Sequence, residues 1–208
     1  MRINTFNNVN KLTLKGKIIA FPTDTVYGIG ALIDDEVAIK KIYNLNKRNL
    51  NKPLAVLAAS IDDILPYVEE IRPNVKILME KYWPGALTII FKKSAKTSPS
   101  VTCGLDTIGF RIPNDETALE ILKKVGPIAT TSINISGQPP LNDYHEIEKE
   151  FGDEIDYLFE KEVKSSNVSS TVIDCTSEDI KVLRQGEDRK STRLNSSHVA
   201  LSRMPSSA

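Results

Sequence analysis

The sequence predicts an α/β fold, and two patterns in it point there. Short apolar runs alternate along the chain with segments whose apolar residues recur every three or four positions. The first pattern is typical of buried strands and the second of helices with one apolar face, so strands and helices are expected to follow one another. The composition agrees, because 40% of the 208 residues are hydrophobic and 26% are charged, as in globular proteins with one substantial core.

In the first half of the chain, strand and helix signals follow in a regular order. The run KIIAF ends at Pro22, as expected of a buried strand, and the acidic pair Asp34 and Asp35 can cap a helix. Apolar residues at 61, 64, 65 and 68 have a helical spacing that stops near Pro73. The elements expected here are a strand over 17–21, a helix carrying Ala38, Ile42 and Leu45, a strand over 54–58, and helices over 61–71 and 75–82.

The second half begins after the break Trp83-Pro84-Gly85 and repeats the alternation. Two strands are joined there by a loop rich in Ser, Thr and Lys over 92–102. The next helix has apolar residues at 118, 119, 122 and 125, and Gly126 can end it because glycine suits a helix C-terminus. The elements expected besides this helix are strands over 87–91 and 107–112, an extended segment over 127–131, a loop over 137–140, a short helix around Ile147 and Phe151, and strands over 171–174 and 180–183.

The chain divides into a body over residues 1–188 and a tail over residues 189–208. The tail has six Ser, four Lys or Arg and no Asp or Glu, without helix or strand periodicity. We interpret it as non-native sequence, with a solvated native extension as the alternative. The whole chain has 27 basic and 27 acidic residues, so the body without the tail carries a net charge of −4. That charge does not favour a protein that binds nucleic acid through a broadly basic surface.

Several common kinds of site lack their residues. The body has one histidine, His145, in a polar stretch, and the two cysteines, Cys103 and Cys175, are not spaced as metal ligands, so His-based triads and metal sites are not expected. Neither the GxGxxG loop nor the P-loop occurs. No apolar run reaches the ~18 to 20 residues that span a bilayer, and no secretory signal is present, so a cytoplasmic protein without membrane contact is expected.

Hydroxyl-bearing residues cluster in three places beside the expected strands. One cluster, over 22–28, follows the first strand, and a second, over 130–137, includes Ser132 and Asn134 on one side of an extended segment. The third is Ser169 to Thr171. A single cluster of this kind is commonly a turn held by local hydrogen bonds. Because open α/β sheets bind ligands at the carboxyl ends of strands, the first two clusters together indicate a binding site.

Cationic residues accompany these clusters. Lys47, Arg48 and Lys52 come just after the first expected helix, and Arg184 follows an apolar pair. Arg111 lies inside the otherwise apolar strand TIGFRIP, so its guanidinium must either face solvent or pair with an anion. A guanidinium fork matches a carboxylate or a phosphate, which makes Arg111 a candidate ligand for either group.

Seven segments occur in the order and spacing of a known family: FPTDTVYGIGAL, NKRNLNKPLAVL, YWPGALTIIF, TIGFRIP, TTSINISGQPP, SSTVID and VLRQG. Over residues 12–186 the sequence therefore resembles the threonylcarbamoyl-AMP synthase family, which has the YrdC-like domain, and its length resembles the short, single-domain type. The resemblance implies an α/β fold with an open twisted mixed sheet, flanking helices and a concave, positively lined cavity. It also implies a nucleotidyltransferase that condenses L-threonine, bicarbonate and ATP into threonylcarbamoyl-adenylate, with release of pyrophosphate, for threonylcarbamoyladenosine modification of tRNA.

The resemblance also assigns roles to individual residues. It places Thr25, Arg111, Ser132 and Ser170 at threonine. It places Arg48, Lys52, Thr107, Asn134, Asn142 and Arg184 at ATP. Arg48 and Lys52 are the candidates for a catalytic part, through positioning and charge neutralisation. The resemblance further implies that Mg²⁺ arrives with ATP, and that downstream threonylcarbamoyl-transfer proteins take the product, while direct contact with tRNA is left open.

Some positions depart from the family pattern. Asn46 stands where a lysine is expected, so either the helix end turns Lys47 into the site or that charge is absent. Leu57 stands where family members often have histidine, and Asn142 is the polar substitute in a segment where Ser-Pro-Thr is usual. Asp24 is expected to be a structural cap, with a role as a metal ligand or base as the alternative.

Other functions stay open beside this one. A non-catalytic RNA-binding protein of the same fold would need only a basic concave face, although the net charge of the body argues against it. A carbamoyl-adenylate-forming domain for hydrogenase maturation would belong to a much longer chain with zinc-finger-like cysteines, which this sequence lacks. A paralogue with a different substrate is the third alternative. Pyrophosphate release that needs both threonine and bicarbonate would exclude the RNA-binding alternative.

Overall fold

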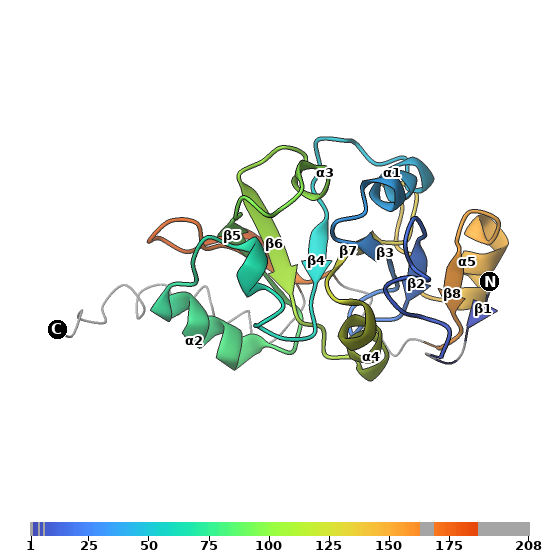
Figure 1. The fold of residues 1–208 in the computed structure, drawn as a ribbon, viewed down its shortest axis with the longest axis horizontal. Helices are drawn as coiled ribbons and strands as arrows, with labels where there is room; N and C mark the ends of the chain where they lie inside the picture. The colour runs from blue at the N-terminus through green and yellow to red at the C-terminus, as the bar shows by residue number, and fades with distance from the viewer. Residues whose placement is uncertain (1, 4, 6, 163–168, 187–208) are drawn as a thin grey trace.

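One mixed sheet organises the protein in the computed structural model, which describes residues 2–3, 5, 7–162 and 169–186. Figure 1 shows the sheet crossing the whole molecule, from β1 and β8 at one side to β5 at the other. The strand order is β1-β8-β2-β3-β7-β4-β6-β5-β9-β10. The strands are β1 Arg2–Ile3, β2 Ile19–Phe21, β3 Gly28–Leu32, β4 Ala55–Leu57, β5 Leu87–Lys92, β6 Thr107–Arg111, β7 Ile128–Ser132, β8 Tyr157–Phe159, β9 Thr171–Asp174 and β10 Lys181–Arg184.

The sheet contains both parallel and antiparallel strand pairs. β8 pairs in parallel with β1 and β2, β4 with β6, and β5 with β9. The pairs β2–β3, β3–β7, β4–β7, β5–β6 and β9–β10 are antiparallel. The strands thus form the open mixed sheet that the sequence and the family resemblance predict.

The helices match most of the helix signals in the sequence. They are α1 Glu36–Leu45, α2 Pro73–Tyr82, α3 Pro99–Thr102, α4 Glu116–Val125 and α5 Tyr144–Phe151, with a 3₁₀ turn η1 at Leu65–Tyr67. Asp35 caps α1 by accepting a hydrogen bond from the backbone N–H of Ala38, and Asp115 caps α4 in the same way. Gly126 ends α4 with a positive φ of 85°, as expected of its glycine. No helix within the described ranges is long and apolar enough to cross a membrane.

Side chains of the sheet alternate between two buried layers. On one face, Ala20 and Ile29 belong to the larger apolar cluster, together with the buried residues of α1 and α2. On the other face, Ile19, Phe21 and Ile128 pack with the apolar side of α4. Neighbouring residues of a strand point to opposite faces of the sheet. The polar residues two and four positions after Ile128 on β7 therefore lie on the same face as Ile128, which is the face that α4 covers.

The helix predicted over 61–71 is wrong, because the structure has turns and only the short η1 there. Ser60 and Asp63 exchange hydrogen bonds in the way that residues capping a helix do, but only turns follow them. Pro66 follows and has no N–H to continue a helical ladder. Val68 is extended and bridges to Lys93. The apolar spacing therefore reflects a loop whose side chains, such as the fully buried Ile64, pack into the core.

Three strands have no counterpart among the sequence predictions: β1, β3 and β8. β3 lies at the centre of the sheet, but its sequence GIGAL contains two glycines, which are unfavourable in strands. Its neighbour β7 explains them, since a Cβ at Gly30 would lie 2.3 Å from Ile128 Cγ2 and one at Gly28 would lie 2.9 Å from Thr130 Cγ2. The glycines thus let β7 side chains cover β3.

The short helix α3 lies in a segment that the sequence predicts as loop. The predicted tail over 189–208 lies outside the described residues.

Replacing Gly30 with alanine is expected to lower the free energy of unfolding by about 1–3 kcal/mol, because the added methyl group overlaps Ile128. Urea unfolding of the two proteins measures the difference. Ile128→Ala removes the clashing Cγ2, so the double variant should cost less than the sum of the two single variants. Strictly additive costs would show that the two positions do not touch.

Candidate active site

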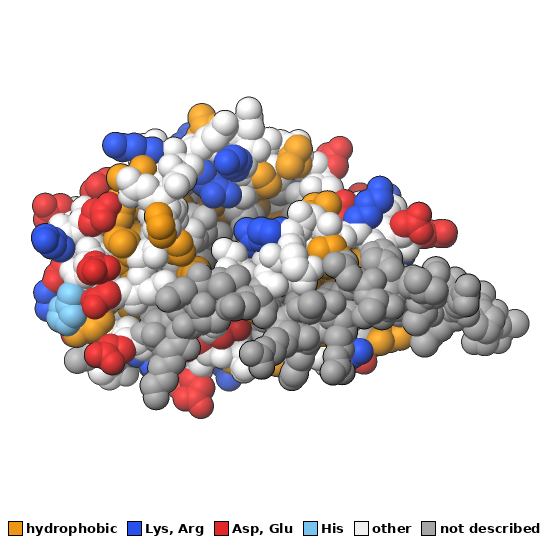
Figure 2. Space-filling view, turned by 180° about the vertical axis from the view of Figure 1, so that it is seen from behind, with side chains coloured by type: hydrophobic (Ala, Val, Ile, Leu, Met, Phe, Trp, Pro, Cys, Tyr) orange, Lys and Arg blue, Asp and Glu red, His pale blue; other side chains and the backbone are white. Residues whose placement is uncertain are grey.

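A cavity of about 340 Å³ lies on one face of the sheet and is lined by residues from both halves of the chain. Its lining includes Gly28, Ala55 and Gly109, small residues of β3, β4 and β6 that keep its floor low. It spreads over the face of the sheet, from Thr107 at the start of β6 to Ser132 at the end of β7. The site is thus not confined to the carboxyl ends of strands, because in a mixed sheet neighbouring strands point both ways. Figure 2 shows Lys and Arg side chains near the centre of one face of the molecule and acidic side chains mainly toward its edges.

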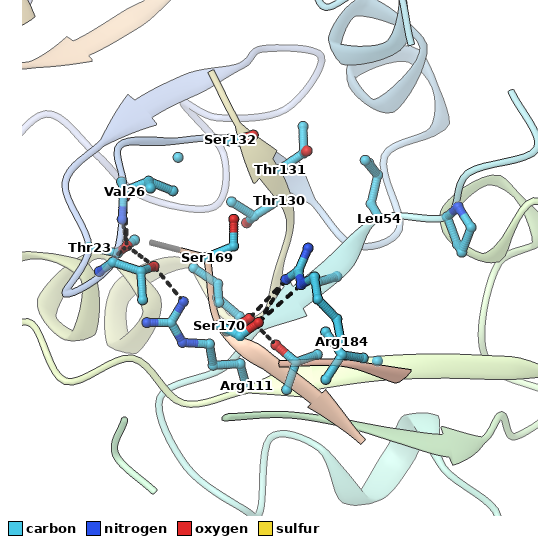
Figure 3. A pocket seen from close by; sticks show the side chains of 18 of the residues that line it. Thr23, Val26, Leu54, Arg111, Thr130, Thr131, Ser132, Ser169, Ser170 and Arg184 are labelled. Carbon is cyan, nitrogen blue, oxygen red and sulfur yellow. Dashed lines mark hydrogen bonds between the residues drawn. The ribbon is translucent and has the colours of Figure 1, made fainter. Parts of the chain in front are cut away.

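The loop after β2 supplies the first group of hydroxyls. Thr23 Oγ1 accepts hydrogen bonds from the backbone N–H groups of Thr25 and Val26, and it donates one to the carbonyl of Val26 at 2.6 Å. It also lies 3.1 Å from Thr25 Oγ1. Both threonines are buried and line the cavity (Figure 3). Hydrogen bonds between neighbouring residues thus hold this turn, as is common for turns rich in threonine. The turn also holds the Thr25 hydroxyl against Arg111.

Arg111 is held on three sides. Its Nε donates to the carbonyl of Gly85 at 2.9 Å, its Nη1 donates to Thr25 Oγ1 at 2.8 Å, and its Nη2 forms an ion pair with Asp24. A guanidinium has five N–H groups, so these bonds leave two, one on each terminal nitrogen. Burial lowers the pKa of Arg111 below its ordinary value, Asp24 opposes that shift, and Arg184 adds to it. Asp24 therefore acts as the counter-ion of a buried cation, which is a structural role but a different one from the cap expected from the sequence.

Arg184 enters the cavity from the edge strand β10. Its guanidinium donates to the carbonyl of Ser170 at 3.0 Å and to Ser170 Oγ at 3.3 Å. Ser170 Oγ lies 2.8 Å from Thr88 Oγ1, so a chain of polar contacts joins β10 to β5. Figure 3 shows Ser170 between Arg111 and Arg184. Burial lowers the pKa of Arg184 below its ordinary value, and the nearby Arg48 lowers it further, so both cations belong to one electrostatic site.

Arg48 is the third cation of the cavity. Its guanidinium donates to the carbonyls of Lys52 at 3.0 Å and Pro53 at 2.9 Å, and to Thr131 Oγ1 at 3.3 Å. Lys47 has a positive φ of 46° and is exposed, and Lys52 is exposed as well. Neither lysine lines the cavity, so the structure brings only Arg48 from this predicted basic cluster into the site.

Asn46 and Leu57, two positions that depart from the family pattern, have well-defined places in the structure. Asn46 is buried at the end of α1, and its amide donates to the carbonyl of Ser132 at 2.7 Å. The helix end therefore does not turn Lys47 into the site, and a neutral amide ties α1 to β7 where the family pattern has a lysine. Leu57 lines the cavity as an apolar wall.

Ser132 lies in the cavity, whereas Asn134 and Asn142 lie beside it. Ser132 lines the cavity and donates to Asn134 Oδ1 at 2.6 Å, while the amide of Asn134 donates to two backbone carbonyls of the following loop. Asn142 Oδ1 accepts from the backbone N–H of Tyr27 at 2.8 Å. Thus Asn134 and Asn142 shape the loops beside the site and do not line the cavity, whereas Thr107 does.

Sequence reasoning missed Thr88, which is buried and lines the cavity beside Ser170. The sequence predicts a strand over 87–91 but does not single out its threonine as a site residue. A threonine two positions before Ile90 is the available signal, because both residues then face the same side of the strand. Thr130 and Thr131, from the predicted cluster over 130–137, also line the cavity.

The cavity offers little to a resident metal ion. Its described lining contains three arginines and no Asp, Glu, His or Cys. Across the part of the chain that the structure describes, no group of three or more His, Cys, Asp or Glu residues is placed to hold a metal. Asp24 is next to the site but is already paired with Arg111. His145 is exposed and stacks on Tyr144, as the polar stretch around it predicts. The residues present therefore do not fit a dedicated metal centre.

A family model described as "Telomere recombination", which covers the Sua5, YciO and YrdC proteins, matches residues 11–186. The chain belongs to this family. It is 37% identical to a threonylcarbamoyl-AMP synthase of Pyrococcus abyssi, over 83% of this chain and 51% of that protein. It is 33% identical to the threonylcarbamoyl-AMP synthase of Vibrio campbellii, over 88% of this chain and 100% of that protein. The chain thus spans about half of one Sua5/YciO/YrdC relative and all of another.

A solved structure of the same family has the same fold. The crystal structure of Pyrococcus abyssi Sua5 complexed with L-threonine superposes with a TM-score of 0.80 and 34% sequence identity. The match covers 89% of this chain and 57% of that one. The family and the α/β fold inferred from the seven sequence segments are therefore confirmed.

Proposed function

We propose that this protein synthesises L-threonylcarbamoyl-AMP from L-threonine, bicarbonate and ATP, with release of pyrophosphate. The observation that carries the proposal is the cavity itself, where Arg48, Arg111 and Arg184 converge with hydroxyl groups and no acidic side chain lines the described wall. All three substrates bring anionic groups, which such a lining attracts. Two relatives carry the name of this activity, and a related protein binds L-threonine, which supports the same conclusion.

The amino acid would bind at the Arg111 end of the cavity. Two N–H groups of Arg111 have no hydrogen-bond partner among the described residues, and a carboxylate takes two such groups in a bidentate contact. Thr25 lies beside them, and the hydroxyls of Ser132 and Ser170 line the same cavity. These four residues are the threonine ligands that we propose.

The nucleotide would bind at the Arg48 and Arg184 end. Both guanidiniums are bonded to neutral oxygen atoms, so their charge is available to phosphates. Thr107 lines the same cavity. Lys52 is exposed and would have to reach in from the rim, while Asn134 and Asn142 would act by holding the neighbouring loops.

The reaction that we propose needs positioning more than acid–base chemistry. The threonine amine attacks bicarbonate, from which water leaves, or attacks CO₂ derived from it and loses a proton to solvent; either route gives a carbamate. A carbamate oxygen then attacks the α-phosphorus of ATP, and pyrophosphate leaves. Arginines held in place by the protein can neutralise charge at the phosphates and orient the reactants, so the reaction does not need a histidine in the described lining of the cavity.

Magnesium and the later fate of the product are also part of this proposal. With no carboxylate in the described cavity wall, Mg²⁺ would come as part of the MgATP substrate and keep most of its waters. The product would pass to proteins that transfer the threonylcarbamoyl group to tRNA. Direct tRNA binding and a cytoplasmic location stay predictions.

The purified protein should release pyrophosphate only when L-threonine, bicarbonate and ATP are all present. Omitting each substrate in turn, with a coupled pyrophosphate assay as readout, tests this directly. Mass spectrometry of the product should show threonylcarbamoyl-adenylate. Binding of RNA without any substrate-dependent pyrophosphate would instead favour the non-catalytic RNA-binding function.

A further inference from the structure

The three cavity arginines differ in their counter-charges. Arg111 is ion-paired with Asp24, whereas Arg48 and Arg184 have no ion pair within the described ranges. The partners of Arg48 are two backbone carbonyls and a threonine hydroxyl, and those of Arg184 are the carbonyl and hydroxyl of Ser170. One end of the cavity is therefore close to neutral, and the other carries two positive charges.

Burial strengthens the effect of Asp24 on the charge of Arg111. The side chains of Arg111 and Asp24 are 7% and 16% exposed, so water and salt screen their interaction weakly. Asp24 is not among the residues that line the cavity, although its sequence neighbours Thr23 and Thr25 are. A ligand in the cavity thus meets an Arg111 guanidinium that is already paired with a negative charge.

We infer that Asp24 determines specificity by dividing the cavity into an amino-acid end and a phosphate end. Asp24 offsets the charge of Arg111, so that end attracts a net-neutral zwitterion through one carboxylate and does not attract phosphate strongly. Arg48 and Arg184, without such an offset, attract the polyanionic phosphates. The identity of the two ligands rests on the proposed function, but the division of charge does not.

The same division explains how two anionic groups are kept in order within one small cavity. If Arg111 were not offset, it would join Arg184 in a second dicationic site, because the two guanidiniums already interact electrostatically. Phosphate would then compete for the position of the amino-acid carboxylate. Asp24 removes that competition and also fixes the Arg111 fork for a bidentate contact.

Asp24→Asn keeps the shape and a hydrogen-bond acceptor but removes the charge. Calorimetric titrations with inorganic phosphate and with L-threonine should show that the ratio of the phosphate Kd to the threonine Kd falls about tenfold in this variant. Asp24→Glu restores the charge and should recover most of the ratio. Asp156→Asn is the matched control, since Asp156 is a partly buried carboxylate paired with Lys41 outside the cavity, and it should leave the ratio unchanged.

A second comparison keeps the test valid if Asp24→Asn folds poorly. The double variant Asp24→Asn/Arg111→Gln removes both charges of the pair, so phosphate should bind within about twofold of the unchanged protein. Arg184→Gln should weaken phosphate binding about tenfold or more. If the double variant loses phosphate as Arg184→Gln does, or if Asp24→Asn weakens both ligands equally, the division of charge is wrong. Loss of the proposed function would look different, because threonine would fail to bind to the unchanged protein while phosphate still bound.

Discussion

Replacing Arg111 with glutamine is expected to raise the KM for L-threonine about 100-fold, while the KM for ATP changes by less than about threefold. Glutamine can occupy a similar volume, but it cannot supply the charged two-point contact that the free N–H groups of Arg111 offer to a carboxylate. Steady-state pyrophosphate release, measured against each substrate in turn, gives both constants. A 100-fold rise in the KM for L-threonine corresponds to a loss of about 3 kcal/mol in binding free energy, which is typical of a desolvated charge pair.

The stability of the variant provides the control for this prediction. Arg111→Gln leaves Asp24 partly buried and unpaired, which should lower the free energy of unfolding by about 2–3 kcal/mol. Adding Asp24→Asn should recover part of that loss without recovering threonine use. A variant whose KM for ATP rises about 100-fold while its KM for threonine stays unchanged would place the nucleotide, and not the amino acid, at Arg111.

Local signals were enough to predict several of the elements around the site. The strand over 17–21, the helix capped by Asp35 and the helix ended by Gly126 all appear where periodicity and capping predict them. The central strand β3 could not be found this way. Its glycines are needed because Ile128 and Thr130 on β7, about 100 residues away, occupy the space that larger side chains would take. The helix predicted over 61–71 failed for a different reason. The apolar residues there have a helical spacing, but most of them pack into the core from a loop around Pro66.

The site residues divide in a similar way. Arg111 stood out in the sequence because a cation inside an apolar strand needs a partner, and the structure shows it in the cavity. Its partner Asp24 is 87 positions away, so no local pattern could reveal that the two form one unit. Thr88 was hidden in a strand that looks like core. Lys47 and Arg48 are adjacent in sequence, yet only the geometry at the end of α1 shows which of them faces the cavity.

Replacing Arg48 with glutamine should raise the KM for ATP about 50-fold and leave the KM for L-threonine within about threefold. Arg48 is held by two backbone carbonyls and one hydroxyl, so its full charge is available to a phosphate in the cavity. Its removal should cost little stability, because no buried counter-ion is left behind within the described residues. Steady-state kinetics with ATP varied at saturating threonine and bicarbonate measures the effect.

Lys47→Gln is the matched control, because it removes the same charge from the neighbouring residue, which is exposed and does not line the cavity. Its KM for ATP should stay within about twofold of the unchanged protein, and that small effect should shrink further as salt is added. If Lys47→Gln instead costs as much as Arg48→Gln, the phosphates must lie over the exposed end of α1. The cavity that the three arginines share would then serve only the amino acid.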